Sequence, residues 1–257
     1  MREIKYDKFS QIYDLSRGIN TKTVDALIKL THINSNSLVL DMGCGTGNYT
    51  AALNHFTKNI IGIDLSLAMI NKAVSKFPNL KFINGNIINL PFRSNLFNGL
   101  YAIQVIHHIE DKFVFLKEVY RILRKKGYIA IHTCSHNQIN TYWYTYYFPE
   151  GLKLELKRFL DIKKLTSLLK KIGFSNIGVK VCYDDSVILN QKPEKYLDKD
   201  FRNGDSMFAL LTENQIEAGC KKLKEDIKSG VINKVLKGYE KRIDIFGGSS
   251  IVYAQKT

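Results

Sequence analysis

The stretch that most constrains this chain is residues 38–47, LVLDMGCGTG, in which an apolar run ends in an acid and glycine then recurs at every second position. An apolar run bounded by a glycine cluster predicts a buried parallel strand over 38–42. The glycines predict a tight turn into a helix over 48–56, because glycine tolerates positive φ and lets the backbone approach a ligand closely. In an open α/β sheet, ligands bind in the crevice beyond such strand ends.

A second acid, Asp64, follows the next predicted strand, residues 59–63. Its separation from Asp41 is close to the roughly 20 residues expected of an acid that binds a ribose hydroxyl. Strand, glycine loop and second acid agree with one another. Together they predict a nucleoside-binding site in preference to an ordinary strand-to-helix turn.

Strands and helices alternate along the first half of the chain, which is typical of a Rossmann-like, doubly wound α/β fold with a mostly parallel sheet. Predicted helices cover 21–32, 67–76 and 111–123, and further predicted strands cover 80–83, 97–103, 128–132 and 174–183. Ser66 is expected to cap the second of these helices, and Gly127 to take the left-handed conformation that stops the third. A final apolar run, residues 250–254, predicts a seventh, antiparallel strand at the sheet edge.

The composition favours a cytoplasmic protein. No run approaches the ~18 consecutive apolar residues of a membrane span, and residues 1–5 lack the apolar core of a signal peptide. The cysteines have no metal-ligand spacing, so we expect reduced, buried thiols and no metal site. They are Cys44, Cys134, Cys182 and Cys220.

The formal net charge of +14 raises the question of an acidic partner such as RNA. The excess consists mostly of lysines spread along the chain, without an arginine-rich stripe that alternates with aromatic residues. Short basic runs such as 121–126 and 221–224 are typical of exposed helix faces. A solvated lysine surface is therefore favoured over a nucleic-acid interface.

The chain resembles the class I S-adenosylmethionine-dependent methyltransferases, in particular the type 11 family that includes the ubiquinone and menaquinone biosynthesis enzymes. The resemblance covers about residues 6–135 and says little about residues 136–250. The matching segments are Tyr6-Asp7 and Tyr13-Asp14, Leu40-Asp41-Met42-Gly43-Cys44-Gly45-Thr46-Gly47, Gly62-Ile63-Asp64-Leu65-Ser66, Asn84-Gly85-Asn86 with Leu90-Pro91-Phe92, Gln104-Val105-Ile106-His107-His108-Ile109, and Arg121-Ile122-Leu123-Arg124-Lys125-Lys126-Gly127.

The resemblance implies a single methyltransferase domain over residues 1–257 that binds S-adenosyl-L-methionine and releases S-adenosyl-L-homocysteine. Residues 1–32 would form an amino-terminal helical cap, and residues 33–135 the cofactor-binding core. Residues 136–172 and 184–245 would form the lid and insertions on the acceptor side.

The resemblance also implies a set of cofactor contacts. The matched residues are Asp41, Gly43 and Gly45 at the methionine end, Asp64 at both ribose hydroxyls, Leu65, Met69 and Ile87 around the adenine, Gln104 beside the methionine, and Tyr13, which closes over the cofactor. Asn86 stands where an aspartate usually accepts from the adenine amino group. An amide oxygen can accept the same hydrogen bond, and its amide nitrogen can donate to a ring acceptor.

A dinucleotide oxidoreductase is the alternative on motif grounds. It would need the spacing G-x-G-x-x-G to seat a pyrophosphate. Here the glycines are closer together, and Asp41 stands at their head. An acid there suits the cationic amino group of methionine and would repel a pyrophosphate.

The catalytic candidates are histidines at strand ends. Methyl transfer from a sulfonium is an in-line displacement that needs alignment and the exclusion of water. A general base is required only when the acceptor is protonated at neutral pH. His107 and His132 are the main candidates for that base, and His108 and His136 are further ones. For the pair at 107–108 the alternative is a structural or cofactor-side role.

A dense aromatic run at residues 142–148 is the candidate acceptor pocket, with Tyr142, Trp143 and Tyr146 as its lining. Aromatic faces attract a sulfonium or an ammonium and shape apolar pockets. The same run would also serve as a set of core anchors for inserted helices. Arg158 could bind an acidic acceptor, but we expect it to be a solvated helix residue.

We therefore expect an S-adenosylmethionine-dependent methyltransferase that acts on a small-molecule acceptor, as a monomer or homodimer. Two alternatives are an RNA methyltransferase, which the charge would suit, and a non-catalytic cofactor-binding protein of the same fold. The intact Asp41, Gly45 and Asp64 argue against the second alternative.

Overall fold

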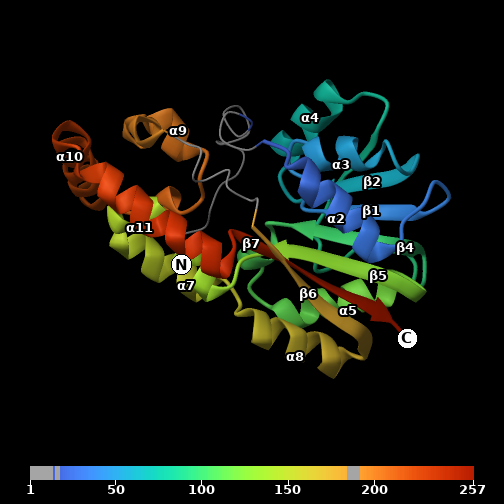
Figure 1. Ribbon diagram of the computed structural model, residues 1–257. Helices are drawn as coiled ribbons and strands as arrows, with labels where there is room; N and C mark the ends of the chain where they lie inside the picture. The colour runs from blue at the N-terminus through green and yellow to red at the C-terminus, as the bar shows by residue number, and fades with distance from the viewer. Residues whose placement is uncertain (1–13, 15–17, 184–191) are drawn as a thin grey trace. The chain divides into compact units, whose positions relative to one another are not determined.

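The computed structural model describes residue 14, residues 18–183 and residues 192–257. Within these residues the chain forms a seven-stranded sheet in the order β3-β2-β1-β4-β5-β7-β6, whose central strands lie side by side in Figure 1. The strands are β1 Leu38–Met42, β2 Asn59–Asp64, β3 Lys81–Asn84, β4 Phe97–Ile103, β5 Leu123–Thr133, β6 Phe174–Cys182 and β7 Ser249–Lys256. The predicted Rossmann-like, doubly wound fold is confirmed.

The strand order reverses at β1, which determines where a ligand can bind. The chain passes from β1 to β2 and β3 on one side, and then returns to β4 and β5 on the other, with all of these strands parallel. Because parallel crossovers are right-handed, the reversal puts the helices that follow β1 and β4 on opposite faces. Ligands of open α/β sheets bind at this switch point, beyond the carboxyl ends of the strands.

The final strand is antiparallel, as predicted, but the predicted position at the sheet edge is wrong. β7 pairs with β5, with Thr133 opposite Ser250 and Tyr128 opposite Gln255. On its other side lies β6, which is therefore the edge strand. Burial explains this order, because β7 is mostly buried, whereas all residues of β6 after Phe174 are half-buried or exposed.

Helices cover the sheet, and those near residues 21–31, 48–53, 67–76 and 112–122 lie where the sequence predicts them. They are α2 Thr21–Thr31, α3 Asn48–Leu53, α4 Leu67–Lys76, α5 Lys112–Ile122 and α8 Ile162–Ile172. The predicted cap at Ser66 is confirmed, because its side chain accepts a hydrogen bond from the Met69 backbone N–H. α2 packs beside α3, and α5 packs beside α8.

The predicted left-handed helix stop at Gly127 is wrong. α5 ends at Ile122, and the chain continues directly into β5. Leu123 pairs with Phe97 and Tyr128 pairs with Gly99, so residues 124–127 bulge out of the ladder, and it is Lys126 that has a positive φ of 62°. Gly127 is needed for space, because a Cβ there would lie 2.9 Å from the carbonyl oxygen of Asn98.

The chain divides into two compact units that interleave in sequence. The sheet unit comprises Ile19–Thr133, Asp161–Lys180 and Ser250–Thr257, and the helical unit takes its described residues mainly from Cys134–Leu160 and Val181–Ser249. Helix α8, which lies within the segment expected to form a lid, belongs to the sheet unit. The helical unit contains α6 His136–Ile139, α7 Pro149–Arg158, α9 Lys199–Asn203, α10 Glu213–Ser229 and α11 Val231–Phe246, with short 3₁₀ turns at Trp143–Tyr146, Pro193–Leu197 and Phe208–Leu210.

Each unit has its own core. The fully buried residues Leu40, Met42, Leu100 and Ile129 lie in the central strands of the sheet. The core of the helical unit is mainly aromatic and includes Trp143, Tyr144, Tyr147, Phe148, Tyr196 and Phe208.

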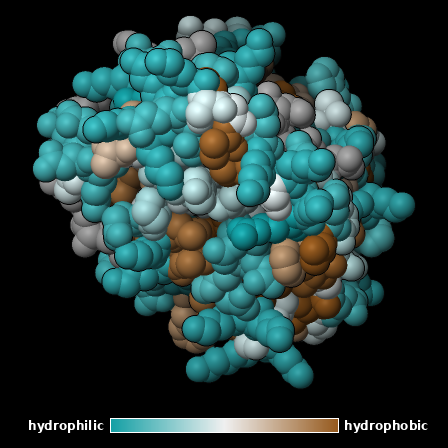
Figure 2. Space-filling model, turned by 60° about the vertical axis from the view of Figure 1, so that its left-hand side comes forward, coloured by the Kyte–Doolittle hydropathy of each residue, from teal (hydrophilic) through white to brown (hydrophobic). Residues whose placement is uncertain are grey.

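Hydrophilic side chains cover most of the face drawn in Figure 2, and hydrophobic residues appear there in small patches. In the part of the chain that the structure describes, no helix combines the length and the apolar character that crossing a membrane requires.

Candidate functional site

The glycine loop after β1 has a backbone that only glycine adopts readily. Gly43, Gly45 and Gly47 have φ values of 73°, 54° and 81°. A Cβ at Gly43 would overlap the side chain of Val105, and one at Gly47 would lie 2.7 Å from the ring of Phe82. The loop is therefore both left-handed and tightly enclosed, which explains the alternating glycines.

Asp64 connects this loop to the end of β2. One carboxylate oxygen accepts a hydrogen bond from the Gly45 backbone N–H at 2.8 Å, and the other accepts from the Ser66 N–H at 2.9 Å. These charge-assisted bonds fix both the glycine loop and the start of α4 around one carboxylate. A carboxylate has about four acceptor sites, so it can bind backbone groups and ligand hydroxyls together.

Asp41, at the end of β1, is buried. Its carboxylate accepts a hydrogen bond from the Thr50 hydroxyl at 2.7 Å, which connects β1 to α3. Burial raises the pKa of Asp41 to about 6, and the nearby charge of Asp64 adds to the rise. A positive ligand group beside Asp41 would counter both effects, so the carboxylate is suited to a cation.

The two apolar residues expected on either side of an adenine differ in exposure. Leu65 is 70% exposed, whereas Met69 is 2% exposed and belongs to the core. Leu65 therefore offers the larger contact surface of the two.

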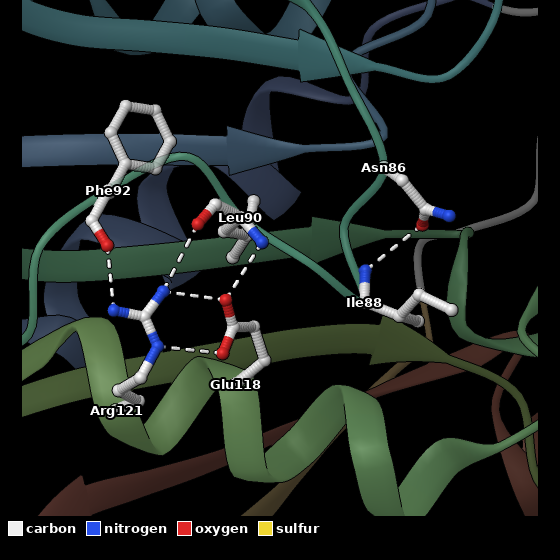
Figure 3. Close-up of polar contacts among 6 residues, drawn as sticks. All are labelled: Asn86, Ile88, Leu90, Phe92, Glu118 and Arg121. Atoms are coloured by element: carbon white, nitrogen blue, oxygen red, sulfur yellow. Dashed lines mark hydrogen bonds and ion pairs between the residues drawn. The ribbon is translucent and has the colours of Figure 1, made fainter.

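Asn86 and Ile87 lie in the loop between β3 and β4. The Asn86 side-chain oxygen accepts from the Ile88 backbone N–H at 3.1 Å, and Figure 3 shows the amide nitrogen directed away from that bond. Ile87 is buried beneath the loop. The amide of Asn86 consequently has a fixed orientation before any ligand binds.

The same loop is held by an ion pair on α5 that the sequence analysis missed. The Arg121 guanidinium donates to the carbonyl oxygens of Leu90 and Phe92 at 3.1 and 2.7 Å, and it pairs with Glu118 at 2.6 Å. Glu118 also accepts from the Leu90 backbone N–H at 2.8 Å (Figure 3). We call Glu118 and Arg121 the loop clamp.

Electrostatics reinforce the loop clamp. The hydrogen bond from Arg121 holds the pKa of Glu118 below its ordinary value, and the reciprocal bond raises the pKa of Arg121. The available sequence signal was the i,i+3 spacing of opposite charges at the end of a predicted helix. That spacing gives no information on which backbone carbonyls a guanidinium will reach.

The residues after β4 come close to the end of β5. Gln104 has a positive φ of 52°, and its backbone N–H donates to the His132 carbonyl oxygen at 2.9 Å. His107 lies in the 3₁₀ turn Ile106–His108, and its ring centroid is 3.9 Å from that of His108. Both His107 and His132 are buried. Their assignment as general bases stays a prediction.

The predicted acceptor residues occupy different environments in the helical unit. Trp143 is fully buried in the aromatic core, so it anchors the fold of that unit. The Tyr142 hydroxyl lies 2.9 Å from the Cys134 sulfur, and Tyr146 is 43% exposed with the Lys222 ammonium 3.9 Å from its ring centroid. The other expected contact, Tyr13, lies outside the described residues.

Two further polar residues of this unit form hydrogen bonds or ion pairs with other protein groups. The His136 ring nitrogen Nε2 lies 2.9 Å from the carbonyl oxygen of Phe159. Arg158 is buried and forms an ion pair with Glu155, so the expectation of a solvated helix arginine is wrong. The helical periodicity of α7 could not reveal this burial, because the periodicity describes only the helix itself. Other elements of the same unit, α9 and the 3₁₀ turns among them, come from later parts of the chain.

No group of three or more metal-ligating side chains was found among the described residues. Cys44, Cys134, Cys182 and Cys220 form no disulfide among the described residues. Burial and the charges of Asp41 and Asp64 raise the pKa of the Cys44 thiol, so this cysteine is unsuited to be a nucleophile.

The part of the chain that contains the glycine loop is similar to known proteins. Residues 40–131 match a family model described as a methyltransferase domain. A demethylmenaquinone methyltransferase from Staphylococcus saprophyticus is 26% identical over 201 residues, which cover 68% of this chain and 85% of that protein. One from Lactococcus lactis is 27% identical, and the match covers 66% of this chain and 77% of the relative.

Solved structures extend the similarity to nearly the whole chain. A proposed methyltransferase from an antibiotic biosynthesis pathway of Anabaena variabilis superposes with a TM-score of 0.79 and 25% identity, covering 93% of this chain and 99% of that one. Phosphoethanolamine N-methyltransferase 2 of Haemonchus contortus, solved with S-adenosylhomocysteine, has a TM-score of 0.64 at 18% identity, covering 97% and 57%. The second similarity supports the fold alone.

Proposed function

The chain is a class I S-adenosylmethionine-dependent methyltransferase of the type 11 family, and we propose that its methyl acceptor is a small molecule. The observation that carries the donor side is the arrangement of Asp64, whose two oxygens hold the backbone N–H groups of Gly45 and Ser66. Because this arrangement fixes a carboxylate beside a left-handed glycine loop, it suits a ribose diol attached to an amino-acid moiety.

We assign the donor contacts to the carboxyl ends of β1, β2 and β3. Asp64 binds the ribose hydroxyls, and Asp41 stabilises the cationic methionine end. Leu65 covers the adenine. Asn86 donates its amide N–H to an adenine ring nitrogen, because its oxygen already accepts from Ile88.

The protein's contribution to the chemistry is mainly positional. When bound, S-adenosyl-L-methionine supplies a methyl group on a sulfonium and leaves as S-adenosyl-L-homocysteine. The glycine loop and Asp64 orient the donor, and the buried residues His107 and His132 limit the access of water. His132 or His107 removes a proton only if the acceptor carries one on its nucleophilic atom.

We place the determinants of acceptor choice in the helical unit. The matched methyltransferase domain ends at residue 131, before Cys134, where the first of the two larger segments of that unit starts. The relatives named demethylmenaquinone methyltransferases support an acceptor of small-molecule size. Tyr142 and Tyr146 are better placed than Trp143 to meet an acceptor, because Trp143 is committed to the core.

The compartment we propose is the cytoplasm. None of the four cysteines forms a disulfide among the described residues, and reduced cysteines are the usual state in a reducing compartment.

The test is the transfer of a labelled methyl group from S-adenosyl-L-methionine to fractionated bacterial small molecules and, separately, to bulk RNA. We expect label in a small-molecule fraction, and we expect Asp64→Ala to abolish it. Asp111→Ala is the matched control, since Asp111 also accepts two backbone N–H bonds but caps α5 away from the glycine loop. Label in RNA would favour the RNA methyltransferase that the net charge of +14 suggests. Donor binding without any transfer would favour a non-catalytic protein.

A further inference from the structure

The helical unit contains a charged pair that lies almost entirely out of contact with solvent. Arg158, at the end of α7, has a side chain that is only 4% exposed, and the side chain of its partner Glu155 is 8% exposed. Removing a guanidinium from water is costly unless each of its donors finds an acceptor. The hydrogen bonds of this pair therefore show whether every donor of the guanidinium has an acceptor within the protein.

Among the described residues, only one nitrogen of Arg158 has hydrogen-bond partners. Nη2 donates to a carboxylate oxygen of Glu155, and it also lies 3.1 Å from the Ser206 hydroxyl oxygen. Nε and Nη1 are enclosed by protein, yet neither has an acceptor among the residues that the structure describes. A guanidinium carries five N–H donors, and three of them belong to these two nitrogens.

The neighbouring acidic residue does not supply the missing acceptors. Asp205 precedes Ser206, but one of its oxygens accepts from the Met207 backbone N–H at 2.9 Å and the other lies 3.4 Å from the Tyr144 hydroxyl. Burial and several nearby charges, that of Glu155 among them, raise the pKa of Tyr144, which is a residue of the aromatic core. The aromatic core and a guanidinium with unused donors therefore belong to the same unit.

We propose that Arg158 binds an oxyanion, a carboxylate or a phosphate group, on a small molecule held by the helical unit. Buried donors in native proteins are nearly always satisfied, so Nε and Nη1 need acceptors from outside the described chain. An oxyanion is the group whose lone pairs and charge match a guanidinium best, and Glu155 fixes the guanidinium in advance. The inference rests on the proposed function in one respect: it identifies this small molecule as the methyl acceptor.

The experiment is titration calorimetry on the full chain saturated with S-adenosyl-L-homocysteine. The probes are benzoate and phenyl phosphate, with benzamide as the neutral analogue of the same shape. We expect at least one anion to bind at least tenfold more tightly than benzamide, and the better anion identifies the carboxylate or the phosphate as the preferred group. The double variant Glu155→Gln with Arg158→Met should reduce the ratio of affinities to about one, because it removes the pair without leaving a buried charge unpaired.

Two further variants make the result specific. Arg158→Lys keeps the charge but loses the planar set of donors, so the preference for the anion should fall without disappearing. Arg202→Gln is the matched control, because Arg202 lies in the same unit but donates to the backbone carbonyl oxygen of Tyr196. That variant should keep the full preference.

The outcomes separate this inference from the proposed function. Equal affinity for anion and amide in the wild-type protein would overturn the inference and indicate that water satisfies Arg158. A preference that survives in the double variant and in Arg158→Lys would also overturn it. Failure of S-adenosyl-L-homocysteine to bind would instead contradict the donor site, and the comparison of benzoate with benzamide would still be measured on the free protein.

Discussion

Asp41 is the residue of the donor site whose protonation depends most on its surroundings. Its pKa of about 6 exceeds the ordinary value of 3.8, so the folded protein without ligand holds the proton more tightly than the unfolded chain does. This contribution to stability is present at pH values below about 4 and is lost as the pH rises through 6. A bound cation reverses the balance, because it favours the charged carboxylate.

We therefore predict that binding of S-adenosyl-L-methionine at pH 6 releases about half a proton from Asp41. Calorimetry in buffers with different ionisation enthalpies measures this release. Asp41→Asn has no proton to lose and should release correspondingly less at the same pH. Equal release by the wild-type protein and the variant would show that the cationic end of the donor does not lie beside Asp41.

Single residues were predictable where a motif prescribes a backbone conformation. The glycines at 43, 45 and 47 were expected at a tight turn, and all three have a positive φ. The sequence could not reveal that Met69 is buried while Leu65 is exposed, because both are apolar residues around the start of one helix. Burial at such positions depends on which strand lies beneath them.

At the scale of elements, the loop clamp connects α5 to the loop that carries Asn86. Three backbone groups of that loop bind Glu118 or Arg121. Among the hydrogen bonds described for the side chains of residues 86–92, no other joins residues so far apart in the sequence. The clamp therefore fixes the loop at Leu90 and Phe92, a few residues after Asn86 along the chain.

We predict that Arg121→Lys raises the KM for S-adenosyl-L-methionine about tenfold and leaves kcat within about twofold, since each lost bond contributes on the order of 1 kcal/mol. Lysine keeps the charge but cannot reach Glu118 and both carbonyl oxygens together. Glu118→Gln should have a smaller effect, because the amide oxygen still accepts from the Leu90 N–H. Steady-state kinetics and calorimetry with S-adenosyl-L-homocysteine measure the change.

The control is Glu150→Gln, which removes an exposed i,i+3 pair with Lys153. It should leave KM unchanged. A lower melting temperature in Arg121→Lys, together with an unchanged affinity for the cofactor, would mean that the clamp only stabilises the fold.

The bounds of elements with a strong hydrophobic period were predicted closely. The order in which the strands neighbour one another in the sheet was not. The strands at 38–42 and 97–103 have the predicted bounds. The place of β7 between β5 and β6 was missed because a buried apolar strand fits a central position, yet its place at the end of the chain suggested an edge. Pairing of strands across the sheet depends on contacts between segments far apart in the sequence.

At the scale of the whole molecule, the two interleaved units divide the proposed function. The sheet unit contains the whole predicted donor site apart from Tyr13, and the helical unit contains the predicted acceptor residues. The family resemblance extended only to about residue 135, so it offered no basis for assigning α8 to the sheet unit. That assignment follows from the packing of α8 beside α5.

We predict that Trp143→Ala abolishes methyl transfer but leaves the affinity for S-adenosyl-L-homocysteine within about threefold of the wild-type value. Removing a buried tryptophan costs about 3–5 kcal/mol, which is enough to loosen the aromatic core of the helical unit. Ile245→Ala is the control, because that side chain on α11 is exposed and its loss should change neither quantity. Joint loss of transfer and cofactor binding in Trp143→Ala would contradict the division of function.

The donor site is tested most directly by calorimetric titration of the wild-type protein, Asp64→Ala and Asp111→Ala with S-adenosyl-L-homocysteine and with NAD⁺. Hydrogen bonds to a charged group contribute about 1.5–3 kcal/mol, so the loss of the Asp64 carboxylate should weaken binding of S-adenosyl-L-homocysteine at least tenfold. Asp111→Ala should bind it as the wild-type protein does, and NAD⁺ should not bind to any of the three. Binding of NAD⁺ comparable to that of S-adenosyl-L-homocysteine, or an unchanged affinity in Asp64→Ala, would contradict the account.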